Sequence, residues 1–69
     1  MEKIKISLAA ARVNAGLTQS DVSKKMHISK QTIVNWEKGI SEPKISQMDE
    51  LLNLYKISRD YIFLPFKSH

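Results

Sequence analysis

The stretch from Thr18 to Gly39 constrains the fold more than any other part of the chain, because it carries the signals of two short helices. Thr18 and Asp21 have the spacing of a capping box, in which each side chain accepts a hydrogen bond from the other residue's backbone amide. Val22 and Met26, four residues apart, give the first of these helices one apolar stripe. The stretch therefore predicts two helices around a tight turn, each too short to bury much surface alone.

The second half of this stretch predicts a helix with one inward side. Ser29 is suited to cap its N-terminus, and Gly39 is suited to the left-handed position that ends a helix. At ~100° per residue, Ile33 and Trp36 fall on one side and are expected to point into the core. Glu37 falls on the same side, where an unpaired carboxylate would be costly, so it is expected to have a cationic partner.

The other side of this helix is polar and is the candidate functional surface. It carries two amides, two lysines, one hydroxyl and one small apolar group: Lys30, Gln31, Thr32, Val34, Asn35 and Lys38. Gln and Asn can form paired hydrogen bonds with adenine, Lys can bond to guanine, and Thr or Val can touch a thymine methyl. An ordinary solvated helix face is also polar, so these residue types alone leave both interpretations open.

Positive charge is concentrated in the first two thirds of the chain. Residues 1–44 contain eight Lys or Arg and four Asp or Glu, whereas residues 45–69 contain three of each. Such asymmetry is expected of a domain that meets a polyanion. A net charge of +4 also keeps a small domain soluble, so charge alone does not decide the function.

From about Leu8 to Ile62 the chain resembles a known family, the helix-turn-helix domains of the phage repressors and Cro proteins, also called the XRE family of bacterial regulators. The matching residues are Arg12, Gly16-Leu17-Thr18-Gln19, Val22, Ser23, Ile28-Ser29, Thr32-Ile33, Trp36-Glu37, Gly39, Pro43, Leu51, Leu54 and Ile57-Ser58-x-Asp60-Tyr61-Ile62. The resemblance implies a compact, all-α, five-helix domain of the lambda-repressor-like type over residues 1–69, with a helix-turn-helix core at about 18–39. It also implies that the third helix lies in the DNA major groove.

Two positions depart from the family pattern. Ser23 stands where the family usually has Ala at a close helix crossing, and Ser is almost as small. His27 stands in the turn where the family usually has Gly with a positive φ, which His tolerates at a cost of about 1 kcal/mol. The resemblance also supplies a partner for Glu37, because the family positions that match Arg12 and Glu37 commonly form an ion pair.

The regions on either side of this core predict further helices. Residues 8–13 are rich in strong helix formers and predict a first helix that ends at Gly16. Residues 1–6 fit either an extended arm or the first turn of that helix. Ser46 is expected to cap a fourth helix, with Asp49 as its capping-box partner. The apolar stripe expected for this helix consists of Met48, Leu51, Leu52 and Tyr55.

The end of the chain combines a predicted fifth helix with an apolar cluster. Ser58 is expected to cap a short helix that runs to about Phe63. The cluster proposed as a dimer interface consists of Tyr61, Phe63, Leu64 and Phe66. It would either cover the core of one molecule or pair two molecules, and both interpretations stay open.

The composition argues against several other classes of protein. The chain has no Cys, so a disulfide framework is excluded. Its apolar runs are far shorter than a membrane span and no signal peptide is evident, so a cytoplasmic protein without a membrane partner is expected. No catalytic motif occurs, and one small helical domain leaves little room for a substrate pocket. An enzyme, a cofactor and a metal site are therefore not expected.

The predicted DNA contacts form two sets. The residues expected at base edges are Lys30, Gln31, Thr32, Val34 and Asn35. The residues expected at the sugar-phosphate backbone are Gln19, Ser29, Lys38, Ser41 and Lys44.

The function predicted from the sequence is that of a sequence-specific transcriptional regulator that binds double-stranded DNA. A small phage-type or bacterial repressor fits best, acting as a homodimer at least on its operator. Two alternatives are a helix-turn-helix module that binds another protein and an antitoxin-type autoregulator with a toxin partner. A protein-binding helix is expected to be rich in aromatic residues, and the polar face found here lacks them.

Overall fold

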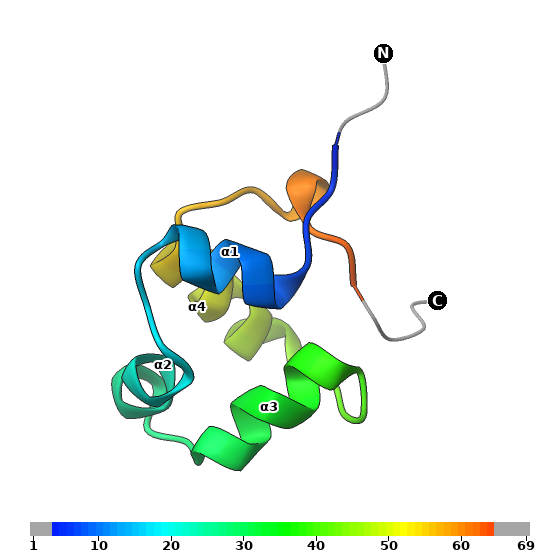
Figure 1. The fold of residues 1–69 in the computed structure, drawn as a ribbon. Helices are drawn as coiled ribbons and strands as arrows, with labels where there is room; N and C mark the ends of the chain where they lie inside the picture. Colours follow the sequence, from blue (N-terminus) through cyan, green and yellow to red (C-terminus); the bar gives the residue numbers. More distant parts are fainter. Residues whose placement is uncertain (1–3, 65–69) are drawn as a thin grey trace.

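The computed structural model describes residues 4–64, and these have the predicted all-α fold. The elements are α1 (Leu8–Asn14), α2 (Gln19–Met26), α3 (Lys30–Lys38) and α4 (Ile45–Tyr55), followed by η1 (Arg59–Tyr61), one turn of 3-10 helix (Figure 1). The prediction of five helices is therefore wrong in its count, since the described residues contain four α-helices.

The predicted fifth helix is reduced to one 3-10 turn because the chain beyond it bonds to the N-terminal segment. Ser58 caps the turn as predicted, and its Oγ accepts a hydrogen bond from a backbone amide of the turn at 3.2 Å. The Ile6 N–H donates to the Tyr61 carbonyl and the Phe63 N–H donates to the Ile6 carbonyl, both at 2.8 Å. These bonds hold Ile62 in an extended conformation, so a helix cannot continue to Phe63.

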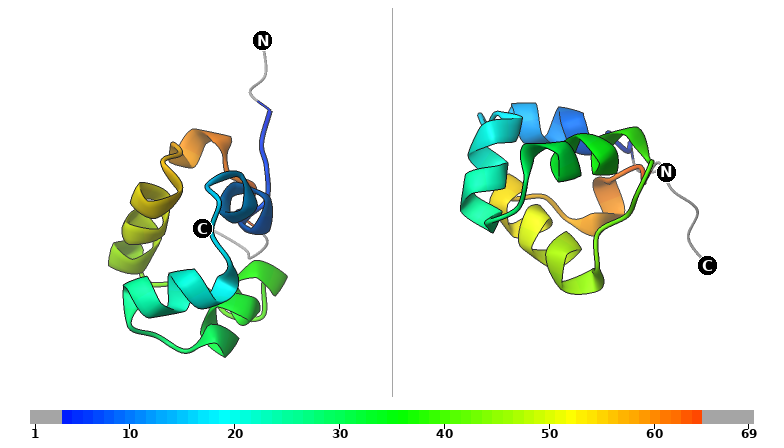
Figure 2. Two further views of the ribbon diagram at one scale, coloured as in Figure 1. Left: turned by 60° about the vertical axis from the view of Figure 1, so that its left-hand side comes forward. Right: turned by 90° about the horizontal axis from the view of Figure 1, so that it is seen from below.

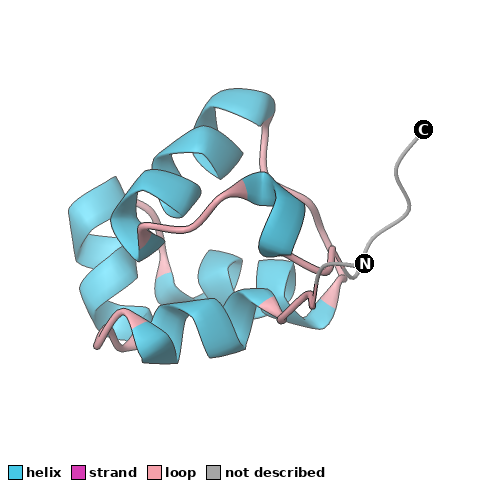
Figure 3. Ribbon diagram, turned by 90° about the horizontal axis from the view of Figure 1, so that it is seen from above, coloured by secondary structure: helices cyan, strands magenta, loops and turns pink. Residues whose placement is uncertain are grey.

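The helices pack as two pairs that enclose one interior (Figures 1 and 2). α2 packs against α3, and α1 packs against α4. Figure 3 shows the loop after α4 crossing the upper face of the molecule toward η1, which lies beside the N-terminal segment. The two ends of the described chain therefore lie side by side, at the Ile6–Ile62 bridge.

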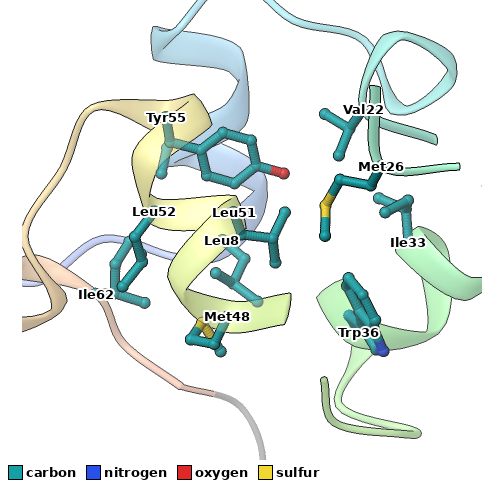
Figure 4. Packing of buried hydrophobic residues seen from close by; sticks show 11 residues of the cluster. Leu8, Val22, Met26, Ile33, Trp36, Met48, Leu51, Leu52, Tyr55 and Ile62 are labelled. Carbon is teal, nitrogen blue, oxygen red and sulfur yellow. The ribbon is translucent and has the colours of Figure 1, made fainter. Parts of the chain in front are cut away.

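The core lies where the helices meet (Figure 4). Its buried residues are Leu8, Ala11, Val22, Met26, Ile33, Trp36, Met48, Leu51, Leu52, Tyr55 and Ile62. Every residue assigned to the apolar stripes of α2, α3 and α4 is among them, so those predictions are confirmed. Ile33 and Trp36 seat α3 against the core, and this contact determines which face of α3 points outward.

The capping signals of α2 and α3 work as the sequence predicted. The Thr18 N–H donates to Asp21 Oδ2 at 2.9 Å, and the Asp21 N–H donates to Thr18 Oγ1 at 3.0 Å. These hydrogen bonds from Thr18 lower the pKa of the Asp21 carboxyl. Ser29 Oγ accepts from an amide of the first turn of α3 at 3.1 Å, and Gly39 ends α3 with φ 77°.

The start of α4 differs from the prediction. The helix begins at Ile45, and Gln47, not Asp49, supplies the backward hydrogen bond, with its Oε1 accepting from the Lys44 N–H at 2.8 Å. Ser46 therefore lies inside the first turn and is not the cap. With the N-cap at Lys44, Gln47 stands at the third position of the helix and its Oε1 satisfies the N-cap amide, as Asp49 would have done for an N-cap at Ser46.

The turn between α2 and α3 generates a prediction about stability. His27 adopts the left-handed conformation expected there, with φ 58° and ψ 43°. Because glycine adopts this conformation without a steric penalty, His27→Gly should raise the free energy of unfolding by up to about 1 kcal/mol in chemical denaturation. Lys25→Gly, at an exposed position in the last turn of α2, is the control and should lower it by up to about 1 kcal/mol. Equal losses in both variants would contradict the assignment of strain to His27.

Candidate nucleic-acid interface

The outward face of α3 brings the predicted base-contacting residues together. α3 lies along one edge of the molecule (Figure 1), and its buried side faces the core. Lys30 and Gln31 are exposed in its first turn, whereas Thr32, Val34 and Asn35 are half-buried. Helical periodicity places Gln31, Val34 and Asn35 on one continuous side, with Lys30 and Thr32 at its two flanks. Whether they contact bases stays a prediction.

Two hydrogen bonds order side chains on this face. Gln31 Nε2 donates to Asn35 Oδ1 at 3.0 Å, across one turn of the helix. Ser29 Oγ and Thr32 Oγ1 lie 2.8 Å apart and share a hydrogen bond at the N-terminal end of α3. Three of the five candidate side chains, Gln31, Thr32 and Asn35, are therefore ordered by hydrogen bonds within the helix and its cap.

Three of the predicted backbone-contacting residues lie at the other end of α3 and in the loop after it. Lys38, Ser41 and Lys44 are all exposed. The Lys44 backbone N–H takes part in the first turn of α4, and the residue is exposed to solvent. Ser29, also assigned to the backbone-contacting set, is exposed at the opposite end of α3. The polar face of α3 is thus flanked at both ends by groups that can donate hydrogen bonds to phosphate.

Gln19 has a partner that the sequence did not reveal. It is the first residue of α2, and its side-chain Nε2 donates to Glu37 Oε1 at 3.0 Å. An amide nitrogen carries two hydrogens, so one N–H stays available after this bond. The phosphate contact of Gln19 stays a prediction. The hydrogen bond to Glu37 determines the orientation of the Gln19 side chain in the absence of a partner.

The predicted ion pair between α1 and α3 is confirmed. Arg12 Nε donates to Glu37 Oε2 at 2.8 Å, and Arg12 Nη1 donates to the Leu17 carbonyl at 3.0 Å. The side chains are only 14% and 9% exposed, and their hydrogen bond raises the pKa of the Arg12 guanidinium. Nearby, burial and the negative charge of Glu37 raise the pKa of Tyr55 to about 12.

The apolar residues at the end of the described chain divide between the core and the surface. Ile62 is buried in the core, whereas Tyr61 is 44% and Phe63 58% exposed, and Leu64 is half-buried. Phe66, the fourth member of the predicted dimer interface, lies outside the described residues. The segment therefore covers the core through Ile62 and still presents aromatic surface to a partner.

Two exposed isoleucines beside the loop from α3 to α4 were not predicted from the sequence. Ile40 and Ile45 are 69% and 80% exposed and flank the loop from α3 to α4. Neither residue belongs to an apolar stripe predicted from helical periodicity. An apolar residue outside these stripes was the signal in the sequence that could have predicted their exposure.

Comparison with known proteins agrees with the geometry. Four helices, with α2 and α3 packed around a left-handed turn and α3 exposed along one edge, define a helix-turn-helix domain. The sequence model of the Helix-turn-helix family matches residues 8–62, so the chain belongs to this family, as its resemblance implied. No solved structure matches it significantly.

A bacterial relative covers the same region. The HTH-type transcriptional regulator ImmR of Bacillus subtilis (strain 168) is 34% identical over 55 residues. The match covers 80% of this chain and 43% of the relative, so the chain spans less than half the length of that protein. Separately, no helix within residues 4–64 has the length and apolar character needed to cross a membrane.

The confirmed ion pair allows a test of its energetic weight. Glu37→Gln should lower the free energy of unfolding by about 2 kcal/mol, between the ~3–5 kcal/mol of a broken buried pair and the ~0–1 kcal/mol of an exposed one. Asp49→Asn is the matched control, because it breaks the more exposed pair with Arg59 at 3.4 Å and should cost under about 1 kcal/mol. Chemical denaturation measures both values, and equal values would contradict the importance of burial at Glu37.

Proposed function

We propose that this chain is a sequence-specific regulator of transcription that binds double-stranded DNA through the outward face of α3. The observation that carries the proposal is this face, on which Lys30, Gln31 and Asn35 are presented by a helix seated on the core through Ile33 and Trp36. A helix fits the DNA major groove, which is about 12 Å wide, and amide side chains match the edge of adenine there.

The placement of charge supports DNA as the partner. Exposed lysines occur at both ends of α3, at Lys30 and Lys38, and in the loop after it at Lys44. Lys38 and Lys44 would bind phosphates and set the register of the helix, while Lys30 and the amides contact base edges. Val34 is the one apolar side chain on this face of α3 and it is half-buried, which is too little for a protein-binding surface.

Selection of bound sequences from random duplex DNA, repeated over a range of salt concentrations, tests this function. Enrichment of a common sequence and a steep fall in affinity with salt are expected. Binding without enrichment and without salt dependence would contradict the proposal and favour a protein partner.

Substitutions in the two sets of contacts should have different effects on binding. Gln31→Ala should cost about 1–3 kcal/mol at the selected sequence and relax the preference at one base pair per half-site. Lys44→Ala should weaken binding to all sequences alike. It should also make the slope of the logarithm of the binding constant against the logarithm of the salt concentration shallower by about one. Titrations with selected and random duplexes measure both effects. If Gln31→Ala weakened both duplexes equally, the base-reading role would belong to another residue.

The proposed regulator acts as a homodimer on DNA. A homodimer would place one copy of α3 on each of two half-sites about 34 Å apart, which doubles the contact surface. The exposed aromatic residues Tyr61 and Phe63 support a dimer interface at this end of the chain. A second copy would cover both side chains, and the Ile6–Ile62 bridge would hold them in place.

Phe63→Asp tests this assembly. The variant should stay folded, sediment as a monomer and bind the selected operator more weakly, because a carboxylate would be buried against the second copy. Val13→Asp carries the same change in charge at an exposed position on α1 and should not alter the mass in solution. If wild-type protein remained monomeric both free and on DNA, the proposed interface would be wrong.

A further inference from the structure

The pair formed by Gln31 and Asn35 is asymmetric. Gln31 is the second residue of α3 and is exposed, whereas Asn35 lies one turn later and is half-buried. The Gln31 amide nitrogen donates to the Asn35 oxygen at 3.0 Å. Asn35, the shorter and less exposed side chain, accepts the hydrogen bond, and this bond orients the longer and more exposed side chain of Gln31.

This bond leaves Gln31 with the groups needed to recognise adenine. An amide has two N–H donors and one carbonyl oxygen, so Gln31 retains one N–H and its oxygen after donating to Asn35. In the major groove adenine offers an acceptor at N7 and a donor at its N6 amino group. The free N–H and oxygen of Gln31 complement these two groups in one plane.

The bond also reduces the entropy that Gln31 would lose on binding. A free glutamine on a surface samples many rotamers, and fixing one of them weakens binding. Residues near the N-terminus of a recognition helix are the ones that reach base edges, and Gln31 lies there while Asn35 lies farther along. The two amides thus occupy positions suited to different tasks.

We propose that Asn35 is a positioning residue that holds Gln31 for a paired contact with one adenine, so that the two amides specify one base pair and not two. This inference rests on the proposed function, since it assigns specificity within the same DNA-binding face. The simpler alternative is that each amide contacts its own base.

Base-resolved selection distinguishes the two arrangements. The proteins to compare are the wild type, Gln31→Ala, Asn35→Ala, the double variant and Asn53→Ala. Both single variants should reduce the preference for adenine at the same base pair, from roughly tenfold or more to near none. The double variant should show no further loss of preference, because either single substitution already removes the contact between Gln31 and adenine. Asn53→Ala is the control, since it makes the same change at an exposed position of α4 and should leave every preference intact.

Conservative substitutions separate positioning from a general structural role. Asn35→Asp keeps an oxygen that can accept from Gln31, so the adenine preference should survive while affinity for all sequences falls because of the added negative charge. Asn35→Leu keeps the branched shape and the number of heavy atoms without an acceptor and should lose the preference, even if Asn35→Ala fails to fold. Thermal melts establish which variants are folded.

Several outcomes would overturn the inference. A preference lost at a different base pair in Asn35→Ala or Asn35→Leu would show that Asn35 reads its own base, and an unchanged preference would show that Gln31 needs no support. Loss of the adenine preference in Asn35→Asp would also contradict it. If wild-type protein selects no sequence, the proposed function itself fails. If wild-type protein selects a sequence but the two amides contribute to it independently, only the positioning role of Asn35 fails.

Discussion

The carboxylate of Glu37 is the group on which the arrangement of the first three helices depends. It accepts from Arg12 of α1 at 2.8 Å and from Gln19 of α2 at 3.0 Å, and Glu37 itself belongs to α3. Because it is shielded from water beside buried Trp36, its charge would be costly without these donors. One side chain therefore fixes both helices of the helix-turn-helix relative to α1, and the outward face of α3 takes its orientation from this contact together with the core.

The features that were predicted correctly from the sequence are those set by near neighbours. The capping box at Thr18 and the end of α3 at Gly39 each depend on a few adjacent residues. Burial of Ile33 and Trp36 follows from helical periodicity, and so does the identity of the opposite, polar face. The two residues of the Arg12–Glu37 pair are 25 positions apart in the sequence. This pair was predicted from the family resemblance together with the inward position of Glu37.

The features that were missed depend on contacts between distant parts of the chain or on competition between similar signals. Ile6 ends the η1 turn from the opposite end of the described chain, and no local pattern around Tyr61 reveals it. At α4 two acceptors were available, Gln47 and Asp49, and the spacing of residues does not rank them. The bond between Gln31 and Asn35 has the spacing of a known helix-surface pair, but a list of polar residues treats the two as independent.

Gln19 connects the stability of the fold to the proposed DNA contact. Its Nε2 bonds to Glu37 at 3.0 Å, and Gln19 begins α2, where backbone amides point outward. A phosphate bound at this position would accept the second N–H of the same amide without breaking the first bond, because one nitrogen carries both hydrogens. The phosphate would then be linked through Gln19 to Glu37 and Arg12, the groups that hold α1 and α3 together. If Gln19 holds a phosphate as proposed, the residues that secure the fold and the residue that positions the DNA backbone would be adjacent links of one hydrogen-bonded chain.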